Sequence, residues 1–138
     1  MSEQTATLVL EIETLQQIYA AINRNDIPAA VAPFDPQMEW IEPAGYPGAG
    51  TYRGRAAVMA NISKGRNTWA EGSCELERFI VAGDKIVVFV HARVRLKGRT
   101  EWGGGRFADV YTFREGKPIQ MRSFGERQDA LDWIGAKT

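Results

Sequence analysis

Residues 107–127, FADVYTFREGKPIQMRSFGER, contain two strand patterns joined by a short turn at 115–116. In the first pattern, over 106–114, alternation places four side chains on one face: Phe107, Asp109, Tyr111 and Phe113. The second pattern predicts a strand over 119–124. Strands joined by so short a turn pair in antiparallel fashion. This stretch therefore predicts a hairpin that carries one carboxylate on an aromatic face.

The rest of the chain predicts helices before the hairpin and a sheet around it. Apolar residues at spacings of three and four predict a helix over 8–25. Shorter helices are expected at 26–32, 55–63 and 126–134, and further strands at 37–42, 74–81 and 85–97. The glycine- and proline-rich segment 43–54 is expected to be a loop at a pocket rim. Residues 1–138 are therefore interpreted as one α+β domain in which a curved, mostly antiparallel sheet packs on three N-terminal helices and a short C-terminal helix follows.

Composition limits the classes of partner. The chain has 17 basic and 17 acidic residues, so no excess of positive charge favours nucleic acid or an anionic membrane. It has no apolar run long enough to span a membrane, and a cytoplasmic location is expected. A single cysteine, Cys74, excludes an internal disulfide, and with one histidine, His91, there is no cluster for a structural zinc. We therefore expect a small or neutral ligand and no structural zinc.

Two carboxylates are expected on apolar faces. Alternation over 37–42 places Glu42 beside Met38 and Trp40, and Asp109 lies among the aromatic residues of the hairpin. A carboxylate with apolar surroundings loses solvation in its charged form, which suits acid–base chemistry. The alternative is that each acid forms an internal salt bridge with an arginine such as Arg53, Arg93 or Arg122. The residues alone leave both interpretations open.

Other candidates for the pocket are less specific. Tyr19 falls on the apolar face of the first helix and could either offer its hydroxyl to a cavity or belong to the core. Trp40 and Phe124 are interpreted as apolar lining. In the strand over 85–97 the even positions are all apolar and should face the helices, whereas the odd positions, His91 among them, would suit a partly solvated surface or a dimer contact.

The chain resembles the SnoaL-like and ketosteroid-isomerase-like members of the nuclear transport factor 2-like superfamily. The resemblance lies in the helical stretch AAINRNDIPAAVAPF, in MEWIEPAG followed by GTYRGRAAV, and in the hairpin quoted above. It implies a cone-shaped half-barrel with a deep apolar pocket, without a metal or an organic cofactor, that forms a homodimer through the sheet. By this resemblance Glu42 takes the position of the general base, and Asp109 that of the protonated acid that donates to an enolate oxygen. The family's oxyanion tyrosine aligns with Ile18, one residue from Tyr19.

These expectations lead to one main hypothesis and several alternatives. The main hypothesis is an enzyme, an isomerase or a polyketide-cyclase-like protein, that moves a proton on a small hydrophobic carbonyl compound. Expected substrate contacts are Tyr19, Trp40, Phe107, Tyr111, Phe124 and, above all in lyase or epoxide hydrolase chemistry, Arg122. The alternatives are a non-catalytic binding protein for a small apolar ligand, and a purely structural dimerisation module.

Overall fold

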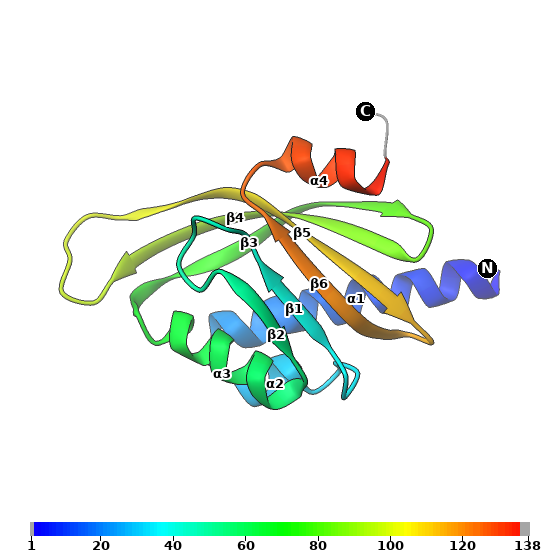
Figure 1. Cartoon of the computed structure of the whole chain (residues 1–138), viewed down its shortest axis with the longest axis horizontal. Helices are drawn as coiled ribbons and strands as arrows, with labels where there is room; N and C mark the ends of the chain where they lie inside the picture. The colour runs from blue at the N-terminus through cyan, green and yellow to red at the C-terminus, as the bar shows by residue number, and fades with distance from the viewer. Residues whose placement is uncertain (1, 136–138) are drawn as a thin grey trace.

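The computed structural model describes residues 2–135, and Figure 1 shows their arrangement. The helices are α1 (Glu3–Asn23), α2 (Ile27–Val31), α3 (Arg55–Arg66) and α4 (Arg127–Ile134). The strands are β1 (Glu39–Glu42), β2 (Gly50–Arg53), β3 (Trp69–Ala82), β4 (Lys85–Leu96), β5 (Gly103–Arg114) and β6 (Lys117–Phe124). None of the helices in this range is both long and apolar enough to cross a membrane.

The strands form one curved, unclosed sheet in the order β2-β1-β6-β5-β4-β3. Every neighbouring pair is antiparallel except β1 and β6, which run parallel. The predicted hairpin is β5 and β6, and its register places Asp109 opposite Ser123. Helices α1, α2 and α3 cover one face of the sheet, and α4 lies on the other (Figure 1). The predicted cone-like α+β architecture is therefore confirmed.

Local chemistry explains how the first two helices begin and meet. Ser2 caps α1, because its hydroxyl accepts a hydrogen bond from the Thr5 backbone N–H at 3.1 Å. Between the helices, Asn25 adopts a positive φ of 61° and reverses the chain. Asp26 then caps α2, which carries Pro28 in its first turn, where a missing N–H costs nothing.

The main core lies between the first three helices and the inner face of the sheet. The even positions of β4 face it, as predicted, with Ile86, Val88 and Val90 fully or almost fully buried. The odd face of β4 is not simply a solvated surface, because Val87 is fully buried beneath α4 with Ala108, Val110 and Ala130. An apolar face of α4 thus covers this part of the sheet. His91 lies further along the same face, next to Glu75 and Arg106 in the register.

Glycine-rich segments account for the elements whose bounds were predicted wrongly. Segment 43–54, expected to be all loop, contains strand β2 paired with β1. Strands β3 and β5 begin at Trp69 and Gly103, earlier than the alternation suggested. In β5, Gly104 has a φ of +116°, and a side chain there would overlap the carbonyl of Ala92 on β4. Glycine lets these strand ends pair closely but erases the side-chain alternation that reveals a strand.

The outer edge of the sheet, β3, is held by the last residue of α1. The Asn23 side chain donates to the Cys74 carbonyl at 2.9 Å and accepts from the Cys74 N–H at 2.8 Å, as a neighbouring strand would. One side chain therefore satisfies two backbone groups of an edge strand and fixes the end of α1 against it.

Replacing Asn23 with alanine should therefore lower the free energy of unfolding by about 1–3 kcal/mol, because two partly buried backbone groups lose their partners. Urea unfolding measures this loss. Asn67→Ala, at the exposed end of α3, serves as the control and should change stability by less than about 0.5 kcal/mol. Equal losses in the two variants would contradict the role of Asn23.

Candidate functional site

Five of the residues that the sequence singled out lie on α1 or on the face of the sheet that the first three helices cover: Tyr19, Trp40, Glu42, Asp109 and Tyr111. Trp40 and Glu42 point from β1 to the same side, and the Trp40 indole Nε1–H donates to Glu42 Oε1 at 2.6 Å. From β5, Asp109 and Tyr111 point toward α1, which presents Tyr19. The predicted alternation in both strands is therefore correct.

Tyr19, Asp109 and Tyr111 form a buried hydrogen-bonded cluster. The Tyr19 hydroxyl donates to Asp109 Oδ2, and the Tyr111 hydroxyl donates to the Tyr19 oxygen at 3.0 Å. The Tyr111 ring stands edge-on to both Tyr19 and Trp40, with ring centroids 6.2 and 6.3 Å apart. The other Asp109 oxygen, Oδ1, is buried and has no hydrogen-bond partner within residues 2–135. Tyr19 is thus a core residue whose hydroxyl serves the carboxylate.

Neither carboxylate forms a salt bridge within the described part of the chain. Arg53 pairs instead with Glu39 on the other face of β1, at 3.1 Å. Arg122 lies on the outer face of the sheet, 5.0 Å from the ring centre of Trp133 in α4. The alternative in which these arginines neutralise Glu42 and Asp109 is therefore wrong.

Burial without a counter-charge makes both acids weak. Loss of solvation raises the pKa of Glu42 from 4.5 to about 7; the nearby Asp109 charge adds to the rise, and the Trp40 hydrogen bond opposes it. Burial likewise raises the pKa of Asp109 from 3.8 to about 6, against the lowering effects of the Tyr19 and Ser123 hydroxyls. Burial also raises the pKa of both tyrosine hydroxyls well above 10. The two tyrosines therefore remain neutral, while Glu42 can exchange its proton near neutral pH.

A cavity of about 430 Å³ opens beside Glu42. Its walls come from the end of α1, β1, the loop before β2, β2 itself, and the end of α3 with the start of β3. The lining residues are Ile22, Trp40, Glu42, Pro47, Gly48, Tyr52, Asn61, Ile62, Lys64, Gly65, Arg66, Thr68 and Trp69. The expected rim loop is thus confirmed at residues 47 and 48, and Glu42 is the one acid in this lining.

Several predicted contacts lie outside this cavity. Asp109, Tyr19, Phe107 and Tyr111 belong to the layer behind it and are absent from its lining. Phe124, like Arg122, points to the outer face of the sheet, where its ring packs 5.7 Å from that of Trp133. The expectation that these two residues line the pocket is wrong, because Met121 and Ser123 are the ones that face inward in this register. Asp109 is buried and is not part of the lining, so it does not donate directly to a ligand in this cavity.

Sequence reasoning missed most of the far wall of the cavity. Tyr52 lies in the unrecognised strand β2, and Asn61, Lys64 and Arg66 belong to the C-terminal half of α3. Helical spacing could have indicated part of this wall, because it places Asn61 and Lys64 next to each other on neighbouring turns of α3. Within residues 2–135 no group of three or more His, Cys, Asp or Glu side chains could hold a metal ion.

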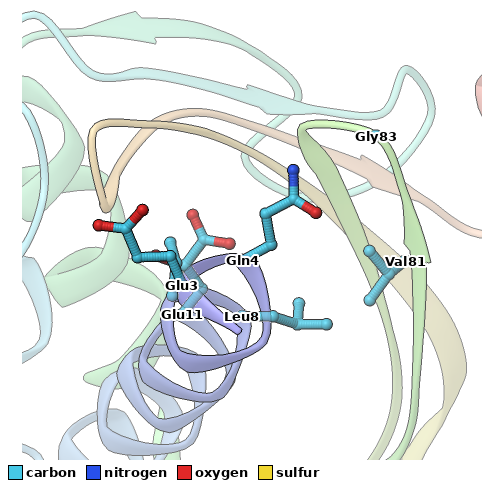
Figure 2. A pocket seen from close by; sticks show the side chains of 7 residues that line it. Glu3, Gln4, Leu8, Glu11, Val81 and Gly83 are labelled. Atoms are coloured by element: carbon cyan, nitrogen blue, oxygen red, sulfur yellow. The ribbon is translucent and has the colours of Figure 1, made fainter. Parts of the chain in front are cut away.

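A second hollow, of about 620 Å³, lies between the start of α1 and the β3–β4 turn. Figure 2 shows that Glu3, Gln4, Leu8 and Glu11 approach it from the helix, opposite Val81 and Gly83. Partial burial raises the pKa of Glu11. No residue predicted for the site reaches this hollow, and its lining lacks aromatic side chains, so the cavity beside Glu42 is the candidate functional site.

The raised pKa of Asp109 predicts how stability depends on pH. The folded protein holds this proton more tightly than the unfolded chain, so the stabilisation is complete below pH 3.8 and is lost as the pH rises through about 6. Between about pH 4 and pH 7.5, wild type should lose on the order of 2–3 kcal/mol of unfolding free energy relative to Asp109→Asn. Urea unfolding at both pH values measures the difference. Glu101→Gln, at an exposed position, is the control: its unfolding free energy should change with pH as that of wild type does. If wild type and Asp109→Asn lose the same unfolding free energy between the two pH values, Asp109 does not carry a buried, unpaired charge.

Comparison with solved structures identifies the fold. TerC, co-crystallised with polyporic acid, is 25% identical, with 92% of this chain and 99% of that chain covered and a TM-score of 0.75. An NTF2-like protein of unknown function from Burkholderia pseudomallei is 26% identical, with coverage of 92% and 98% and a TM-score of 0.75. A putative SnoaL-like polyketide cyclase from a Jannaschia species is 15% identical, with a TM-score of 0.73 and 94% of both chains covered, and so shows the fold alone.

Curated proteins give no significant match to the chain. The SnoaL-like domain family, by contrast, matches residues 15–121, a span that includes Tyr19, Glu42 and Asp109. The fold supports an enzyme-like or ligand-binding role. Most of the chain lies within the matched span, and the structural neighbours share its architecture; the protein therefore belongs to the SnoaL-like family of the nuclear transport factor 2-like superfamily.

Proposed function

We propose that the protein is a cofactor-independent enzyme that moves a proton on a small hydrophobic carbonyl compound bound in the cavity beside Glu42. The observation that carries the proposal is a carboxylate without a salt-bridge partner in the wall of a cavity that also presents the aromatic rings of Trp40, Tyr52 and Trp69. Its pKa of about 7 makes it both a usable base and a usable acid at neutral pH. The co-crystallisation of the similar protein TerC with polyporic acid supports a small organic ligand for this fold.

In the proposed reaction, the Glu42 carboxylate removes a proton from the carbon next to the carbonyl group. The electrons of that C–H bond form a carbon–carbon double bond to the carbonyl carbon, and the π electrons of the C=O bond move onto the oxygen, which gives an enolate. Glu42, now protonated, returns the proton to another carbon of the same conjugated system, which gives the isomer and regenerates the carboxylate. Asn61 lines the same cavity and offers a neutral amide donor to the enolate oxygen.

Asp109 acts indirectly in this scheme. It lies behind the cavity wall, and its negative charge raises the pKa of Glu42. The Tyr19 hydroxyl donates to it, and the Tyr111 hydroxyl donates in turn to the Tyr19 oxygen. It is therefore a positioning and tuning residue, whereas Glu42 is the catalytic residue.

The exchange of deuterium into 2-tetralone, followed by NMR, tests the reaction. Wild type should accelerate exchange, and Glu42→Gln should lose at least about 100-fold in rate, because a positioned base contributes that much. The rate should rise with pH through about 7, as Glu42 loses its proton. Glu39→Gln is the matched control: the residue lies on the same strand but faces outward to Arg53 and Gln120. Wild-type rates in Glu42→Gln would contradict the mechanism.

A non-catalytic binding protein is the second candidate, and the position of Asp109 favours it, because the donor that the family resemblance assigned to the enolate does not reach the cavity. The two candidates separate in one pair of measurements. If wild type binds 2-naphthol, an analogue of the enol of 2-tetralone, as tightly as Glu42→Gln does and accelerates no exchange, the protein holds its ligand without reacting.

A further inference from the structure

Two cations stand at one side of the cavity without acidic partners. Lys64 and Arg66, from the last turn of α3, line the cavity, and neither forms a salt bridge within residues 2–135. The only acid in the lining is Glu42, which is about half protonated at neutral pH. The cavity wall therefore carries a net positive charge, although the protein as a whole has none.

Arg66 is held rigidly in this position. Its Nε donates to the Ile22 carbonyl at 2.8 Å and its Nη2 to the Asn23 carbonyl at 3.0 Å, which satisfies two carbonyl groups at the end of α1. The guanidinium carbon lies 4.6 Å from the ring centre of Trp69, another lining residue. Its remaining nitrogen, Nη1, makes no hydrogen bond to the described residues. The positive charge of Arg66 is thus held in place beside an aromatic wall of the cavity before any ligand binds.

The other walls suit a flat apolar body. Trp40, Tyr52 and Trp69 supply aromatic surface, and Ile22 and Ile62 supply aliphatic surface. Glu42 lies on β1, whereas Lys64 and Arg66 come from the end of α3. A ligand with an acidic group toward α3 and a carbonyl toward β1 would use both. A cationic ligand would meet two fixed positive charges and only one carboxylate that is partly neutral.

We propose that the cavity selects a planar aromatic or enolic acid, whose anionic group binds Lys64 and Arg66 while its carbonyl end lies at Glu42. This inference rests on the proposed function, because it assigns the substrate class of the same cavity. Lys64 is the residue that tests it. Arg66 also holds the end of α1, so its replacement would disturb the fold, whereas Lys64 is exposed.

The test compares 2-naphthoate with 2-naphthamide, which has nearly the same shape and no charge, by calorimetric titration into the full chain. Wild type should bind the acid roughly tenfold more tightly than the amide. In Lys64→Gln the affinity for 2-naphthoate should fall roughly threefold to fivefold, and that for 2-naphthamide should not change. Lys117→Gln, on the β5–β6 hairpin, is the matched control and should bind both probes as wild type does.

The possible outcomes distinguish the failure of this inference from the failure of the proposed function. If wild type binds the amide as tightly as the acid, the cavity accepts aromatic ligands but the anion preference is wrong. If Lys64→Gln lowers only the free energy of unfolding and keeps the tenfold preference, Lys64 does no more than complement the dipole of α3, and the inference is again wrong. If neither probe binds, both the inference and the proposed function lose their basis.

Discussion

Asp109 is a carboxylate placed in the middle of the core, and its hydrogen bond from Tyr19 joins α1 to the centre of the sheet. Burial makes its negative charge unfavourable, and within the described residues no cationic side chain forms a salt bridge with it. Tyr19 donates to the carboxylate and Tyr111 donates to Tyr19, and the rings of the two tyrosines pack with Trp40 behind the cavity. The position of β1, and with it that of Glu42, depends on this layer.

The cluster explains why a fold would keep an unfavourable group. A hydrophobic residue in place of Asp109 would pack without the cost of desolvation, but it would also remove the negative charge that weakens Glu42 as an acid. The neighbours of Glu42 also shield it from water, and this loss of solvation is the larger effect. Desolvation and the charge of Asp109 therefore both raise the pKa of Glu42. The buried charge of Asp109 thus lowers stability but helps to give Glu42 a carboxylate that both accepts and releases a proton near neutral pH. Such perturbed groups are common at functional sites.

Sequence patterns predicted the site best where side chains alternate in regular strands. The faces of β1 and β5 followed directly from Met38, Trp40 and Glu42 and from Phe107, Asp109 and Tyr111. Prediction failed where the conformation and register of the backbone, and not the alternation of side chains, determine the bounds of a strand or the direction of a side chain. The glycines before β2 and at the start of β5 hide strands, and the direction of Phe124 and Arg122 depends on a register shift beside the β5–β6 turn that no pattern of residues reveals. The cations of the cavity wall were missed because exposed lysines and arginines at the end of a helix are common and usually only solvated.

The central claim is that Glu42 is an unpaired, desolvated carboxylate with a pKa near neutrality. The most direct measurement is a carbon NMR titration of the protein with glutamate side-chain carboxyls labelled, in which Glu42→Gln identifies the Glu42 resonance by its loss. The account predicts that this resonance titrates with a midpoint of about 7, well above that of the exposed glutamates. A midpoint below about 5 would show that Glu42 is solvated or neutralised, and the cavity would then lack the base on which the account depends.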